Sequence, residues 1–169
     1  MGKIGPVFNL PIKRLSTSSG IVLINAHKKP PHLGLFSNGK YYSLTANEVQ
    51  NGLAIDVMLQ LIHRKKIPSI FVFFNDNIPN NLVEEVFGSY TSLSNGITCI
   101  APIKKVISAK IDNSANVNFV FELIPALENI NYIESYAEMY CADFLEDDFF
   151  KLRNYSMQDV VQRIQKLVK

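Results

Sequence analysis

Two side chains of this chain could together perform thiol chemistry. His32 lies in the segment Pro-Pro-His-Leu-Gly-Leu, and Cys141 lies in the segment Met-Tyr-Cys-Ala-Asp-Phe. The residues after the histidine predict a β-strand, and those around the cysteine predict a helix. A thiolate attacks a carbonyl carbon, and a neighbouring imidazole takes up the thiol proton and later delivers it to the leaving group. A strand histidine and a helix cysteine are therefore the components of a cysteine hydrolase, if the fold brings them together.

The position of Cys141 within its predicted helix decides between two interpretations. If the helix begins near Tyr140, the positive end of the helix dipole stabilises the thiolate and lowers the thiol pKa. If it begins near Glu134, the cysteine lies two turns inside, on an apolar stripe, and acts as a small hydrophobic residue. Cys99 is predicted to lie in an apolar strand, where burial raises the pKa of a thiol. Cys141 is therefore the expected reactive thiol and Cys99 the inert one.

As a general base, His32 needs a hydrogen-bond partner on its second ring nitrogen. The next predicted strand carries Tyr41, Ser43 and Thr45, and the register decides which of them faces the histidine. None of these residues is the Asp or Asn that usually orients a catalytic imidazole. The third member of the site is therefore unassigned.

The histidines also allow a metal site, formed by His27, His32 and His63 with Asp56. Their spacing matches no zinc-finger or metalloprotease pattern. His63 lies in the last turn of a predicted helix, where a cation is favoured by the helix dipole. Glycine-rich phosphate loops are absent from the sequence. The sequence therefore predicts neither a metal nor a cofactor.

The segment from His32 to Tyr42 resembles the His-box hairpin of NlpC-type papain-like hydrolases, in which a strand of the form His-apolar-Gly-apolar leads into a turn at glycine. In the circularly permuted members, including the lecithin–retinol acyltransferase group, the His box precedes a Cys box on a helix. The residues from Tyr140 to Leu145 resemble that Cys box. The resemblance implies Cys141 as nucleophile, His32 as base and an amide or thioester substrate. Residues 53–101 depart from it, because their helix–strand–helix–strand pattern is closer to a parallel βαβ unit.

The rest of the sequence predicts the elements that would position these residues. The Asn38-Gly39 pair predicts a tight hairpin turn. The nearly continuous apolar run 69–74 predicts a central strand that is covered on both faces. Ser156 caps a last helix, whose apolar stripe must dock on the domain or on a partner. The predicted strands are 21–24, 32–36, 40–45, 69–74, 96–101 and 117–123, the predicted helices are 53–66, 80–90, 134–152 and 157–168, and 112–116 is a predicted loop.

Composition limits the class of protein. With 169 residues, 47% apolar and 19% charged, the chain is expected to form one folded domain, residues 1–169, with a polar lead-in at 1–19. The net charge of +2 and the lack of interleaved basic and aromatic residues predict no nucleic-acid partner. No apolar run is long enough for a signal peptide or a membrane span. Two cysteines provide no disulfide framework, so a cytoplasmic location is expected.

The sequence thus predicts one mixed α/β (α+β) domain, with a single β-sheet, packed helices and a helical C-terminus; the resemblance implies a permuted papain-like topology. The predicted function is a cysteine-dependent hydrolase or acyltransferase that acts on an amide or thioester bond of a small molecule or peptide. The alternative is a non-catalytic binding or adaptor domain, in which Cys141 and His32 are structural. Exposure of the cysteine and its proximity to the histidine discriminate between the two.

Overall fold

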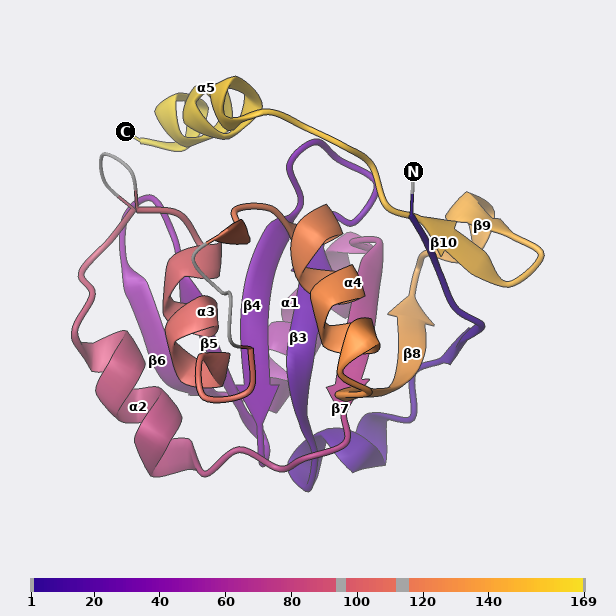
Figure 1. The fold of residues 1–169 in the computed structure, drawn as a ribbon, viewed down its shortest axis with the longest axis horizontal. Coiled ribbons are helices and arrows are strands. Elements are labelled where there is room, and N and C mark those ends of the chain that lie inside the picture. Colours follow the sequence, from indigo (N-terminus) through magenta and orange to yellow (C-terminus); the bar gives the residue numbers. More distant parts are fainter. Residues whose placement is uncertain (1, 94–96, 112–115, 169) are drawn as a thin grey trace.

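The computed structural model describes residues 2–93, 97–111 and 116–168 (Figure 1). These residues form a seven-stranded mixed sheet with helices on both faces, and a three-stranded sheet beside it. The predicted mixed α/β class with a helical C-terminus is confirmed, and the small sheet is an addition to the single sheet predicted. The predicted loop at 112–116 lies, except for its last residue, outside the described residues.

The large sheet is antiparallel except at one edge, where β2 runs parallel to β8. Its strands, in spatial order, are β2 (Val7–Asn9), β8 (Ile133–Met139), β7 (Ser69–Phe74), β3 (Ser19–Ile24), β4 (His32–Ser37), β5 (Lys40–Leu44) and β6 (Val49–Ala54). The small sheet consists of β1 (Lys3–Ile4), β10 (Phe149–Lys151) and β9 (Leu145–Glu146). The polar lead-in therefore contributes a strand to each sheet.

Helices cover the two faces of the large sheet unequally (Figure 1). One helix, α1 (Ile55–Lys65), packs on one face, and three pack on the other: α2 (Asn80–Gly88), α3 (Ile100–Ile107) and α4 (Val120–Asn129). Strand β7 separates the two cores, with Phe71 and Phe73 on the α1 side and Ile70 and Val72 on the other. All four side chains are buried, so the prediction of a strand covered on both faces is confirmed. The elements described also include two short 3₁₀ helices, η1 (Ile12–Ser16) and η3 (Ala142–Phe144).

The hairpin between β4 and β5 turns as the Asn-Gly pair predicts. Asn38 and Gly39 both have positive φ, 45° and 79°, which matches the right-handed twist of the flanking strands. Further along, the ring of Tyr41 lies over Gly34, and a Cβ atom there would come within 2.4 Å of Tyr41 Cε2. Only glycine leaves room for this buried tyrosine. The contact packs β5 closely against β4, the strand that begins at His32.

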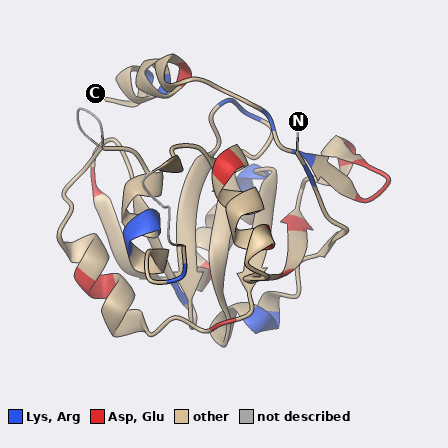
Figure 2. Cartoon of the chain, viewed as in Figure 1, with Lys and Arg blue, Asp and Glu red and all other residues tan. Residues whose placement is uncertain are grey.

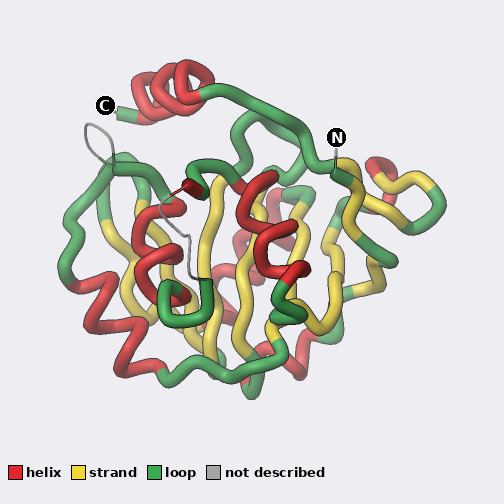
Figure 3. Tube along the Cα trace, in the orientation of Figure 1, coloured by secondary structure: helices red, strands yellow, loops and turns green. Residues whose placement is uncertain are grey.

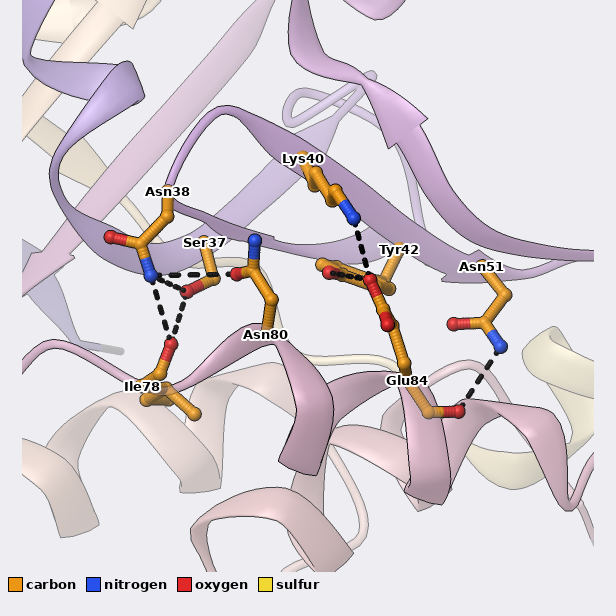
Figure 4. A network of polar contacts seen from close by, with 8 residues as sticks. All are labelled: Ser37, Asn38, Lys40, Tyr42, Asn51, Ile78, Asn80 and Glu84. Carbon is orange, nitrogen blue, oxygen red and sulfur yellow. Dashed lines mark hydrogen bonds and ion pairs between the residues drawn. The ribbon is translucent and has the colours of Figure 1, made fainter.

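A polar network fastens this hairpin to α2 (Figure 4). Glu84 on α2 forms an ion pair with Lys40 at 2.7 Å and accepts a 3.4 Å hydrogen bond from the Tyr42 hydroxyl. Asn51 on β6 donates to the Glu84 carbonyl, and Asn38 donates to the Ile78 carbonyl in the loop before the helix. The hydrogen bond and charge of Lys40 lower the pKa of the Glu84 carboxyl. These contacts are structural, because they lock the helix onto the strand edge.

The last helix, α5 (Met157–Leu167), lies across one end of the large sheet and is reached by a loop from β10 (Figure 3). Ser156 caps it as predicted: its hydroxyl accepts from the Asp159 N–H, and the Asp159 carboxylate accepts from the Ser156 N–H at 2.7 Å. Acidic and basic residues are spread over several elements in the view of Figure 2. Within the described ranges, no helix is both long and apolar enough to cross a membrane.

Candidate functional site

The structure places His32 at the first position of β4, as predicted. Its ring is half-buried at the end of the sheet and forms no hydrogen bond within the described part of the chain. Burial, reinforced by the positive charge of Arg163 on α5, lowers the pKa of His32 to about 4. The imidazole is therefore neutral near pH 7 and has a free lone pair.

A cavity of about 280 Å³ lies between α5 and the end of the sheet. His32 forms part of its wall, and α5 contributes apolar side chains and Arg163 from the opposite side. The remaining wall carries apolar side chains, hydroxyl and amide groups, and one thiol. The residues that line it are Asn25, Pro30, Pro31, His32, Thr45, Ala46, Asn47, Leu93, Thr98, Cys99, Val160, Arg163, Ile164 and Leu167.

Cys99 is the thiol in this wall, and the prediction that it lies in a strand at 96–101 is wrong. Residues from Ile100 onward form α3, and Cys99 occupies the N-cap position of that helix. Burial raises the pKa of the Cys99 thiol, and backbone hydrogen bonds involving Leu33, Cys99 and Ile100 act in the opposite direction. Pro102 is the sequence signal for this helix, because proline is well tolerated in a first helical turn.

Cys141 is not in a helix, and the predicted helix at 134–152 is wrong. The chain forms β8, turns at Tyr140 with a φ of 56°, and then runs through η3, β9 and β10. The Cys141 side chain is 0% exposed and belongs to the apolar core. Burial, with a smaller contribution from the Glu138 carboxylate, raises the pKa of its thiol to about 12. The thiol is therefore protonated, and Cys141 lines neither of the two cavities that His32 lines.

The other histidines lie in separate environments. His27 stacks on Phe144 with ring centroids 4.8 Å apart, and burial lowers its pKa. His63, at the end of α1, is hydrogen-bonded through Nδ1 to the Tyr140 hydroxyl. No group of three or more metal-ligating side chains comes together among the described residues. The alternative metal site, which also included Asp56, therefore has no support in the described part of the chain.

A second, larger cavity of about 720 Å³ runs along α1 on the other side of His32. It shares Asn25, His32 and Thr45 with the cavity under α5, so the histidine lies where the two meet. The sheet edge formed by β5 and β6 provides the opposite wall, including Tyr41 and Leu53. The imidazole is thus accessible from two separate spaces.

Among the residues of α5, only Val160 is buried. A matched pair of substitutions tests whether this residue docks the helix on the end of the sheet. Val160 is buried and faces the cavity, whereas its neighbour Val161 is 44% exposed. Within the same cavity wall, Asn47 donates a 3.4 Å hydrogen bond to the Leu167 carbonyl.

Val160→Asp is expected to accelerate amide hydrogen exchange in α5 about tenfold or more, because it removes the apolar burial that stabilises the docked helix. Val161→Asp should leave exchange near the wild-type rate. Equal exchange in Val160→Asp and wild type would contradict the docking of α5 on this face.

Comparison of the chain with protein-family models, with curated proteins and with solved structures gives no match. The side chains around the cavity under α5 are therefore the basis for a functional proposal.

Proposed function

We propose that the chain is a cysteine-dependent hydrolase or acyltransferase in which Cys99, rather than Cys141, is the nucleophile and His32 is the general base. The observation that carries this proposal is that Cys99 and His32 line the same 280 Å³ cavity. The substrate class is the one that thiol chemistry serves, an amide or a thioester.

The start of α3 supports the role of Cys99. Backbone N–H groups in a first helical turn have no partner within the helix, and they stabilise negative charge on a nearby thiolate or on the oxygen of a tetrahedral intermediate. In the reaction, the His32 imidazole takes the thiol proton while the sulfur bonds to the carbonyl carbon. The proton then passes to the departing amine or thiol, and water or an acceptor releases the acyl group from Cys99.

The order of the two residues along the chain is the second support. His32 opens a hairpin strand and Cys99 follows it at the start of a helix, as in the permuted papain-like proteins that the His32 segment resembles. Without the segment around Cys141, the resemblance rests on the His32 segment and on this order alone. An orienting partner for the imidazole is still lacking, since Thr45 and Asn47 line the cavity without a hydrogen bond to His32.

Both groups are neutral in the closed structure, because burial raises the pKa of Cys99 and lowers that of His32. Displacement of α5 would hydrate the cavity and remove Arg163 from the imidazole, which moves both pKa values toward their ordinary ranges. The proposal therefore includes opening of α5 before chemistry. Val160→Asp, which loosens this helix, is expected to raise the rate of acylation.

The experiment is trapping of an acyl-enzyme. The protein is incubated with short acyl thioesters, and the acylated residue is located by mass spectrometry. Wild type and Cys141→Ala are expected to form acyl-Cys99, Cys99→Ala is expected to form none, and His32→Ala is expected to be acylated about 100-fold more slowly. Acylation of Cys141, or acylation of Cys99 that is indifferent to His32→Ala, would refute the assignment.

The second candidate is a non-catalytic binding domain, and the resting pKa directions favour it. A protonated thiol and a neutral imidazole in a mainly apolar cavity are also what a binding pocket for a small neutral molecule contains. The same experiment separates the two. If neither wild type nor Val160→Asp forms any acyl-enzyme across the thioester panel, the binding function is the better description.

A further inference from the structure

The second cavity forms a groove along α1 with a volume of about 720 Å³. It is the larger of the two cavities that His32 lines, and the proposed thiol chemistry makes no use of it. That volume falls within the range of roughly 300–1,000 Å³ that is typical of small-molecule sites. The wall includes His32 at one end, yet Cys99 does not line it. The side chains that line the groove determine which class of ligand it could bind.

One wall is an apolar stripe on α1. Val57, Leu61 and Arg64 follow a spacing of four and then three residues, so they lie along one side of the helix. Val57 is 50% and Leu61 is 41% exposed, and both face the groove, opposite the half-buried Leu53 of β6. No element among residues 2–93, 97–111 and 116–168 covers these large side chains, although α1 packs closely on the sheet through its other side.

The last turn of α1 contributes His63 and Arg64 to the groove, and amide and hydroxyl groups line it elsewhere, at Asn25, Tyr41, Thr45, Gln50 and Gln60. The Arg64 guanidinium forms no ion pair within the described part of the chain, and no Asp or Glu lines the groove. The Tyr140 hydroxyl is hydrogen-bonded to the ring of His63, and His32, whose ring forms no hydrogen bond within the described residues, lines the same groove. From Val57 to Arg64 the helix rises about 10 Å, which is the length available between the apolar part and the cation.

We propose that this groove binds a small amphiphile with an unbranched apolar body and a single carboxylate. The body would lie against Val57, Leu61 and Leu53, and the carboxylate would pair with Arg64. A free guanidinium beside an apolar wall that lacks acidic residues is complementary to such a molecule in both charge and polarity. The inference goes beyond the proposed function, because it requires no reaction at Cys99.

Titration calorimetry with decanoate tests the proposal, with decanol and decyltrimethylammonium as probes of the head group. Arg64→Gln is expected to weaken decanoate binding about tenfold and to leave decanol binding unchanged, because only the carboxylate loses its partner. Lys65→Gln, next to it on the helix but outside the groove wall, is the charge control and should leave both affinities unchanged.

Leu61→Gln is expected to weaken binding of both decanoate and decanol, since it removes apolar contact from the body. Leu82→Gln is its matched control, because Leu82 on α2 is also 41% exposed and does not line the groove. Both positions are on the surface, and thermal melts verify that the variants are folded. Decanoate binding that is intact in Cys99→Ala separates this site from the thiol chemistry.

Three results would overturn the inference. One is the absence of saturable decanoate binding at millimolar concentration. Another is equal affinity for decanoate and decyltrimethylammonium, which would exclude a role for the guanidinium. The third is that Leu82→Gln weakens binding as much as Leu61→Gln, which would place the amphiphile elsewhere on the surface.

Discussion

Iodoacetamide is expected to alkylate Cys99 at least about 100-fold faster than Cys141 in the folded protein, because a fully buried thiol reacts only when the structure opens around it. Cys141 is 0% exposed and its pKa is raised to about 12, whereas Cys99 is partly exposed in a cavity wall. This reverses the expectation from sequence, in which Cys141 is the reactive residue.

Mass spectrometry of the labelled peptides at neutral pH measures both rates. In urea the two cysteines should react at similar rates, which serves as the control for intrinsic reactivity. Val160→Asp should accelerate labelling of Cys99 alone, because α5 covers only that thiol. Labelling of Cys141 at a rate equal to or above that of Cys99 would contradict the structure and would restore Cys141 as the candidate nucleophile.

The sequence predicted best those elements whose local signals agree with their surroundings. The Asn38-Gly39 turn, the apolar run of β7 and the Ser156 cap each depend on a few neighbouring residues, and all three are confirmed. The helix predicted at 53–66 agrees closely with α1 (Ile55–Lys65). The last turn of α1 carries the expected basic residues. The position of His32 follows from the same hairpin, since its strand begins directly after two prolines.

One error came from periodicity in a window that was too short. Residues 117–123 alternate between apolar and polar over part of their length and predicted a strand, but α4 begins at Val120. The full pattern of Val120, Leu123, Ile124 and Leu127 is helical, and Glu122 accepts from the Phe119 N–H, as a helix-start residue does.

The error around Cys141 has a different cause. Apolar residues at helical spacing predicted a helix over 134–152, but a strand and two turns can produce the same spacing by chance. Asp147 and Asp148 adopt positive φ values of 51° and 65° between β9 and β10. Aspartate tolerates this conformation, so the Asp-Asp pair between Glu146 and Phe149 is a turn signal that competes with the helix. Which cysteine lines a cavity with His32 depends on how α3 packs against β4, and this packing involves residues far apart in the sequence.

Phe71→Ala is expected to lower the free energy of unfolding by about 3–5 kcal/mol, which is the range for removing a buried phenylalanine ring. Phe71 is fully buried on β7, between β3 and β8, and its ring centroid lies 6.0 Å from that of Phe36 in a tilted arrangement. No exposed face is available to let the cavity fill with water. Urea denaturation followed by far-UV circular dichroism measures the change, because the chain contains no tryptophan.

Phe8→Ala is the matched control for this substitution. Phe8 lies on the edge strand β2 and is 60% exposed, so its removal should cost less than about 1 kcal/mol. The comparison also concerns the site, because β7 holds β3, and β3 in turn pairs with β4 up to His32. A destabilisation by Phe71→Ala no larger than that by Phe8→Ala would mean that β7 is not the central strand, and the sheet end that carries His32 would then lack its rigid support.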